Sequence, residues 1–271
     1  MLEVYARDIG PIAEISLRIP RVCLIYGPIA SGKSYLLRLM NLVVLAHELS
    51  IVRGEKEEDV LCRALVKELA LPKELSSIDT ARLRELMTKL ILRRGARRGE
   101  LVMKGDKFEV RLDVSKALDL QVEGDLPIMI YVPQERAAGE LIMSETRRYI
   151  ERVMRFVEQG FEASIAIRLM LAGMVGEKDL LMANYIASLA GAISVLGGDI
   201  PKHKEEVRGA YDRALEVSYD LERGLILIKD HEVQYPIAAK MTTPLGALEA
   251  ANILTLVNGA VKFSEETGRN S

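Results

Sequence analysis

The sequence predicts an α/β fold, a mixed sheet that begins with an N-terminal β-hairpin and carries helical insertions. Residues 1–20 alternate apolar and polar side chains on either side of Ile9-Gly10-Pro11, the pattern of two strands joined by a turn. Residues 22–26 and 126–135 are continuous apolar runs, typical of strands buried on both faces of a sheet covered by helices. With 271 residues, 49% of them apolar, the chain can form one large α/β domain.

Helical spacing predicts the elements that follow the first apolar run. A helix runs from residue 33 to about Ser50, and residues 51–75 continue with leucines at helical spacing. Another helix begins near Thr80, with Asp79 as its N-cap and Gly95 as its stop.

The remaining elements alternate between hairpins and helices. Residues 99–114 predict a hairpin that turns at Gly105-Asp106, because two alternating runs flank this dipeptide. From residue 144 to 222 the pattern is mainly helical. Residues 225–237 read as another hairpin, and residues 244–263 as a last helix with Leu256 and Val257 facing inward.

These elements suggest a single domain over residues 1–271. Its core would comprise residues 1–46, 126–143 and 220–271. Residues 47–125 would form an insert of helices and a β-hairpin, and residues 144–219 a helical part.

Composition narrows the class of protein. The net charge of −2 gives no overall basic field for nucleic acid, so any such contact must be local. Cys23 and Cys62 are too few for a disulfide scaffold, and Cys23 is expected to be a small buried residue. The three histidines show no metal-ligand spacing. A cytoplasmic location fits the two cysteines and the absence of a signal peptide.

One apolar stretch has to be weighed against a membrane span. Residues 180–198 contain no charged side chain and approach bilayer length. Polar residues and three glycines interrupt the stretch, which favours a buried helix running into a turn. No membrane partner is therefore expected.

The strongest functional signal is a glycine-rich loop between the first apolar run and the helix after it. Residues 27–34 read Gly-Pro-Ile-Ala-Ser-Gly-Lys-Ser, which matches G-x-x-x-x-G-K-[ST] between a predicted strand and a predicted helix. In such a loop the backbone N–H groups converge on a phosphate at the positive end of a helix. The lysine then contacts the β- and γ-phosphates, and the hydroxyl completes a Mg²⁺ shell. A glycine-rich turn of a Rossmann-like unit would leave Lys33 and Ser34 unexplained.

The candidate binding residues follow from this motif. Ser34 is the candidate Mg²⁺ ligand, and ATP with Mg²⁺ is the expected cofactor pair. The residues expected to bind nucleotide are Gly27, Pro28, Ile29, Ala30, Ser31, Gly32, Lys33, Ser34 and Tyr35.

The order of these elements resembles a known family. A hairpin, then strand–GxxxxGKS–helix, a long insert and a strand ending in Tyr-Val-Pro-Gln look like the P-loop NTPase domain of ABC-type proteins, closest to the RecF/SMC/OLD-like AAA ATPases. The resemblance implies an ABC-ATPase-like mixed sheet. It also implies that Gln134 approaches the metal and the attacking water, with Arg136 nearby. The alternative is a surface glutamine after a proline that ends a strand.

The resemblance is incomplete toward the C-terminus. Residues 242–246 (Thr-Thr-Pro-Leu-Gly) stand where the family has a Ser/Gly signature that contacts the phosphate bound by a second protomer. The acidic strand that should follow is not found. Asp230 and Glu232 are an unlikely substitute, because they precede the signature position and 233–237 pairs more naturally as a hairpin partner. We therefore expect the isolated chain to bind Mg·ATP better than it hydrolyses it.

Three functions remain open. The first is an ATPase that couples ATP binding, with or without hydrolysis, to conformational change or dimerisation, as a homodimer or with a partner chain that completes the core. The second is a non-hydrolysing nucleotide-binding switch or assembly module, and the third is a P-loop small-molecule kinase. DNA is a further candidate partner, since four arginines in residues 93–98 suit a phosphate backbone. A solvated loop with favourable helix C-terminal charge explains the same arginines.

Overall fold

The chain forms two compact units, Met1–Tyr131 with Leu171–Ala183, and Val132–Met170 with Asn184–Ser271. The computed structural model describes the following residues: 1–20, 23, 25, 31–69, 71–72, 75, 78–127, 129, 131, 152–153, 155–156, 159–161, 163–175, 180–196, 215–220, 225–230, 233–236, 256–257, 259 and 261.

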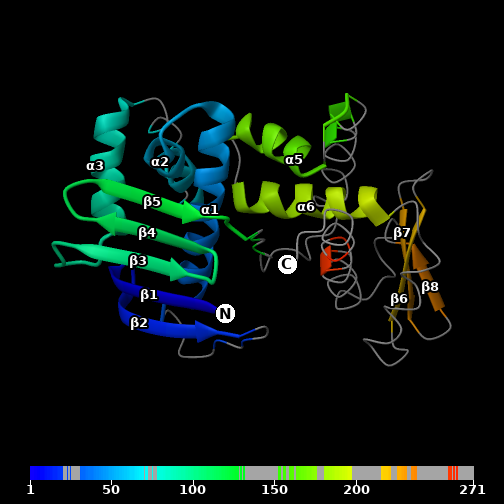
Figure 1. Cartoon of the computed structure of the whole chain (residues 1–271), viewed down its shortest axis with the longest axis horizontal. Helices are drawn as coiled ribbons and strands as arrows, with labels where there is room; N and C mark the ends of the chain where they lie inside the picture. The colour runs from blue at the N-terminus through cyan, green and yellow to red at the C-terminus, as the bar shows by residue number, and fades with distance from the viewer. Residues whose placement is uncertain are drawn as a thin grey trace. The chain divides into compact units, whose positions relative to one another are not determined.

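The first unit contains a five-stranded sheet whose neighbouring strands all pair antiparallel, in the order β2-β1-β3-β4-β5 (Figure 1). The hairpin predicted for residues 1–20 is confirmed, and its first strand also pairs with β3. The strands are β1 (Leu2–Ile9), β2 (Ile12–Ile19), β3 (Gly99–Lys104), β4 (Phe108–Val114) and β5 (Leu118–Gly124).

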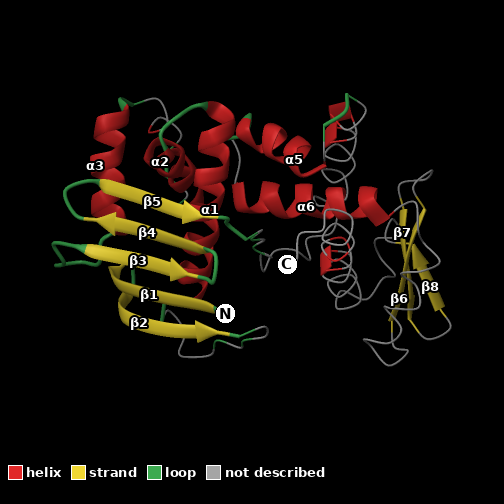
Figure 2. Cartoon of the chain, viewed as in Figure 1, coloured by secondary structure: helices red, strands yellow, loops and turns green. Residues whose placement is uncertain are grey.

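Helices α1 (Lys33–Arg53), α2 (Glu57–Glu68) and α3 (Thr80–Ile91) cover one face of this sheet (Figure 2). Successive side chains of a strand point to opposite faces, so every second residue faces the helices. These inward residues are apolar and fully buried. They include Val4, Ala6, Leu101, Met103, Val110 and Leu112.

The opposite face of the sheet is charged and solvated. Residues directly opposite each other on neighbouring strands form ion pairs there. Glu3 contacts Arg18 at 3.1 Å, Arg7 contacts Glu100 at 3.2 Å, and Lys104 contacts Glu109 at 3.3 Å. Polar residues on one face and apolar residues on the other fix the register, because a shift of one residue would exchange the two faces.

Helix α1 is the central helix of the first unit. Its residues from Leu39 to Ala46 are all buried, so the middle of the helix has no solvent face. Among the described residues, α1 is the one helix long and apolar enough to cross a membrane by length and composition. The same properties belong to a core helix, and most of α1 is buried within the fold.

Local sequence signals were accurate in this unit. Asp79 caps α3, its carboxylate accepting hydrogen bonds from the Ala81 and Arg82 amides. The hairpin between β3 and β4 is confirmed, and its turn contains one residue more than the predicted Gly105-Asp106 pair. The predicted helix ends were less accurate. Helix α1 continues to Arg53, and α3 stops at Ile91, before Gly95.

The expected mixed sheet is seen only in its coarse class, a mixture of helices and strands. Cys23 and Ile25, the described residues of the first apolar run, are not part of a strand, and neither are Met129 and Tyr131 of the second. The other residues of 22–26 and most of 128–143 lie outside the described residues. A short apolar run does not by itself specify a strand, which explains the difference.

The second unit contains a three-stranded antiparallel sheet, β6-β7-β8, formed by Leu215–Asp220, Leu225–Asp230 and Val233–Pro236. The hairpin predicted for residues 225–237 is thus confirmed. The helical prediction fails for 215–220, where alternating residues of Leu-Glu-Val-Ser-Tyr-Asp form a strand opposite β7.

Helices α5 (Ala163–Ala172) and α6 (Leu180–Leu196) lie between the two sheets in the sequence. The buried helix expected at residues 180–198 is confirmed over the part described. Residues Leu256 and Val257 are helical, but only Leu256 is buried. Adjacent residues of a helix point in directions about 100° apart, so both cannot face a narrow core.

Candidate phosphate-binding site

The described part of the glycine-rich loop forms the start of α1. Gly27, Pro28, Ile29 and Ala30 lie outside the described residues, whereas Ser31 to Tyr35 are described. Gly32 is the N-cap residue and has a left-handed backbone with φ of +90°. Other residues adopt this conformation at a cost, which accounts for glycine at this position. The Gly32 carbonyl accepts the first helical hydrogen bond from the Leu36 amide at 2.8 Å.

The N-terminus of α1 carries no negative charge of its own. Gly32, the N-cap residue, has no side chain that could cap the helix, and the first turn contains no acidic residue. The first amides of a helix have no acceptor within the helix, and the helix dipole makes this end positive. An anion is the natural ligand for such an end.

The side chains of the motif lie beside these amides. Lys33 Nζ donates a hydrogen bond to Ser31 Oγ at 3.1 Å, so the ammonium lies beside the residue that precedes the N-cap. Ser34 is exposed, and Lys33 is half-buried. A lysine ammonium, a serine hydroxyl and helix N-terminal amides together form a donor set that suits a phosphate with a bound divalent cation.

The turn between β1 and β2 packs directly against the same end of α1. A Cβ added at Gly32 would lie 2.9 Å from Ile12 Cγ1 and 3.0 Å from Pro11 Cγ. The ring of Tyr35 lies against Gly10, and burial of this ring raises the pKa of its hydroxyl to about 12. The first turn of the helix is therefore held between its own core residues and the hairpin turn.

One helical turn further on, Arg38 joins three parts of the chain. Its Nε donates to Tyr131 Oη at 3.1 Å, and its Nη1 contacts Glu68 Oε1 on α2 at 3.0 Å. The guanidinium carbon also lies 5.5 Å from the centre of the Tyr131 ring. The glutamate is nearly buried, so a neutralising arginine lowers the cost of its burial.

The contact with Tyr131 bears on Gln134, the predicted water- and metal-sensing residue. Gln134 and Arg136 lie outside the described residues. Tyr131 precedes Gln134 by three positions, and it contacts the helix that begins at the glycine-rich loop. The structure thus places Tyr131 against Arg38, one helical turn after Ser34 on α1.

A small cavity of about 160 Å³ opens beside Ser34. This volume is well below the roughly 300–1,000 Å³ of pockets that enclose a whole small-molecule ligand. Its polar lining is Ser34, Tyr35, Arg38 and Glu68, and its apolar lining is Leu39, Leu42, Leu65 and Leu69.

The arginine cluster of residues 93–98 is partly neutralised. Arg93 lies 3.9 Å from Asp8, and Arg98 contacts Asp113. That hydrogen bond raises the pKa of the Arg98 guanidinium. Arg94 and Arg97 are exposed. Two of the four arginines therefore neutralise carboxylates of the sheet, which favours the interpretation of this segment as a solvated loop.

The other candidate residues are only partly placed. Asp230 is the last residue of β7, where it pairs with Leu215 of β6 and Val233 of β8. Glu232 and residues 242–246 lie outside the described residues. Among the described residues, no group of three or more His, Cys, Asp or Glu could hold a metal ion. His47 instead contacts Glu57 at 2.6 Å.

The prediction for Cys23 was wrong. Cys23 is exposed, whereas Cys62 on α2 is buried, and burial raises the pKa of the Cys62 thiol to about 12. Apolar neighbours in the sequence do not determine which position of a run faces the protein, and the described residues around Cys23 form no strand.

Sequence reasoning missed three contributors to the site, namely Arg38, Glu68 and Tyr131. Arg38 could have been found, since it follows Ser34 by four positions and so lies on the same helical face. Glu68 and Tyr131 are joined to it only by tertiary structure.

No model of a known protein family matches the chain, and no curated protein matches it with significant similarity. The interpretation of the site therefore depends on the residues and contacts described above.

Proposed function

We propose that the chain binds Mg·ATP at residues 27–35, as a P-loop NTPase domain of the ABC type resembling RecF, SMC and OLD ATPases. The observation that carries the proposal is the geometry at the start of α1. A left-handed glycine as the N-cap residue, a lysine whose ammonium contacts Ser31 and an exposed serine occur together at a helix N-terminus.

Each group has a distinct role in the proposed site. The amides at Gly32 and beyond, with Lys33, bind the β- and γ-phosphates, and the Ser34 hydroxyl binds Mg²⁺. The contact between Arg38 and Tyr131 supports placing Gln134 near the γ-phosphate, where its amide would orient water.

The wider proposal concerns what ATP binding controls. Binding would drive a conformational change or dimerisation of a cytoplasmic protein, either with a second copy or with a partner chain that completes the ATPase core. DNA contact would fall to Arg94 and Arg97, the two exposed arginines whose neighbours Arg93 and Arg98 contact carboxylates.

The decisive experiment replaces Lys33. Lys33→Ala should weaken ATP binding about 10- to 100-fold, because a charge-assisted contact to phosphate is lost. Its melting temperature should stay close to that of the wild type, since Lys33 is absent from the buried core. Isothermal titration calorimetry with Mg·ATP measures the affinity.

Lys56→Ala is a matched control. Lys56 is exposed and also precedes a helix, as the N-cap residue of α2, but no glycine-rich loop precedes it. Its replacement should leave ATP affinity unchanged. Equal affinity of the wild type and Lys33→Ala would contradict the proposal. Turnover measured on the same samples separates an ATPase from a non-hydrolysing module.

A further inference from the structure

The turn between β1 and β2 makes an unusually close approach to the phosphate-binding end of α1. Gly10 has φ of +52°, and a Cβ placed there would lie 2.6 Å from Tyr35 Cε1 and 2.7 Å from Tyr35 Cζ. A Cβ added at Gly32 on α1 would in turn meet the side chains of Pro11 and Ile12 of the β1–β2 turn. Two glycines, one on each element, therefore permit this contact, and neither position has room for a side chain.

Backbone hydrogen bonds to residues 91–93 fix the turn in place. The Gly10 amide donates to the Ile91 carbonyl at 2.6 Å, and the Arg93 amide donates to the Asp8 carbonyl at 3.0 Å. Ile9 also forms a bridge with Leu92. Asp8 adopts a positive φ of 52°, the only described residue other than glycine to do so. Backbone strain of this kind persists only where the surroundings enforce it.

We propose that the turn of residues 8–12 is a positioning element for the phosphate-binding loop, with Gly10 and Tyr35 as its contact pair. This inference rests on the proposed function of residues 27–35. Gly32, the N-cap residue, has no side chain to fix the first turn of α1, and the hairpin turn packs directly against this end of the helix. Amides aimed at a phosphate in advance bind it without an ordering cost, and a displacement of about 1 Å can lower rates about 100-fold.

Gly10→Ala tests the contact directly. The added methyl group must displace the Tyr35 ring, and we expect ATP affinity to fall about tenfold. Gly54→Ala is the matched control, because Gly54 ends the same helix with a similar φ of +63° and has nothing within 4 Å of an added Cβ. Both variants carry the same kind of backbone strain, but only Gly10→Ala carries the clash.

A double-mutant cycle with Tyr35→Ala isolates the contact pair. Removing the ring removes the clash, so Gly10→Ala should change ATP affinity at least about threefold less in the Tyr35→Ala background than in the wild type. An effect of the same size in both backgrounds, and no larger than that of Gly54→Ala, would overturn the inference.

Amide hydrogen exchange without nucleotide tests the positioning role separately from ATP binding. Gly10→Ala should accelerate exchange at residues 33–37 while leaving α2 and α3 unchanged, and Gly54→Ala should leave residues 33–37 unchanged. Unaltered exchange in Gly10→Ala would refute the positioning role. Loss of ATP binding in the wild type would instead refute the proposed function.

Discussion

The two ends of α1 are built in opposite ways. At the N-terminus, Gly32 carries no side-chain cap, and the first turn has no acidic residue. At the C-terminus, Gly54 takes a left-handed backbone and its amide donates to the Ser50 carbonyl, while Arg53 provides a positive charge at the negative end of the helix.

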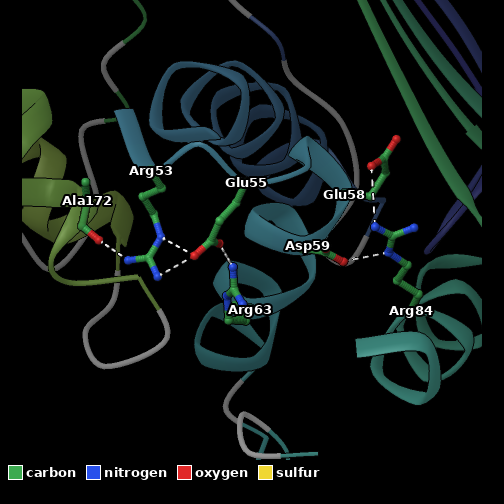
Figure 3. A network of polar contacts seen from close by, with 7 residues as sticks. All are labelled: Arg53, Glu55, Glu58, Asp59, Arg63, Arg84 and Ala172. Atoms are coloured by element: carbon green, nitrogen blue, oxygen red, sulfur yellow. Dashed lines mark hydrogen bonds and ion pairs between the residues drawn. The ribbon is translucent and has the colours of Figure 1, made fainter. Parts of the chain in front are cut away.

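A network of ion pairs extends the C-terminal end (Figure 3). Arg53 donates to Glu55 at 3.1 and 2.8 Å and also to the Ala172 carbonyl, and Arg63 of α2 contacts the same glutamate. On the neighbouring turn of α2, Arg84 of α3 contacts Asp59 at 2.7 Å and Glu58 at 3.7 Å. The C-terminal end of α1 is thus joined to α2 and to Ala172 by charged side chains, whereas the first turn of the helix contains no acidic residue.

The two ends of α1 differ in which groups could satisfy the terminal backbone amides and carbonyls of the helix. A helix needs partners for its terminal amides and carbonyls, which come from the protein, from water or from a ligand. At the C-terminus of α1 the protein supplies them. At the N-terminus the N-cap residue is a glycine without a side chain, and the β1–β2 turn packs against the first turn.

The largest effect should separate two leucines of α1. Leu49 is completely buried near the C-terminal end, whereas Leu37 near the N-terminal end is 39% exposed. Leu49→Ala should lower the free energy of unfolding by about 2–5 kcal/mol, since it leaves a cavity in the core. Leu37→Ala should change it by less than about 0.5 kcal/mol. Urea unfolding measures both, and similar losses would remove the contrast between the two ends.

An intermediate effect should follow from Glu55→Ala. Without the carboxylate, two arginines remain close together with no negative charge between them. Burial, and then the charge of Arg53, already lower the pKa of the Arg63 guanidinium. We expect a loss of about 1–2 kcal/mol in the free energy of unfolding, with unchanged ATP affinity.

Glu85→Ala provides the comparison for that network. Glu85 pairs with Lys89 on α3 at the exposed surface, where solvent screens the charges, so its replacement should change the free energy of unfolding less than Glu55→Ala does. If Glu55→Ala destabilises the protein no more than Glu85→Ala does, the network does not brace the end of α1.

The smallest effect should appear at alkaline pH. Burial raises the pKa of Tyr35 from 10 to about 12, so the folded protein holds this proton more tightly than the unfolded chain. The resulting stability is fully present below pH 10 and is lost as the pH rises from 10 to 12. Tyr35→Phe keeps the ring but removes the titrating hydroxyl. Between pH 10 and 12 the free energy of unfolding of this variant should therefore fall less than that of the wild type, by on the order of 1 kcal/mol. Urea titrations at each pH measure the difference.

Much of the first unit was predictable because its signals are local. Asp79 before a helical pattern specifies a cap, and alternation on both sides of Gly105 specifies a hairpin. The pairing of β1 with β3 was not predictable. It places Ala6 opposite Leu101, and nothing within either segment encodes a partner so distant in the sequence.

The candidate site likewise contains residues that a local motif identifies and contacts that form only in the folded chain. Lys33 and Ser34 were identified by a motif whose spacing is local. The contacts of Arg38 with Tyr131 and of Gly10 with Tyr35 were not, because each joins segments that only the folded chain brings together. Cys23 shows the opposite error, since an apolar context suggested burial for an exposed residue.

The position of β1 between β2 and β3 also has a consequence for how the chain is made. Glu3 pairs with Lys104, about 100 residues later in the chain. At roughly 5–20 residues per second of synthesis, β3 leaves the ribosome several seconds after the N-terminal hairpin. During that interval the backbone groups along one edge of β1 have no strand partner, and such an edge can pair with other chains. Closure of so long a loop also makes slow folding the expectation for this sheet.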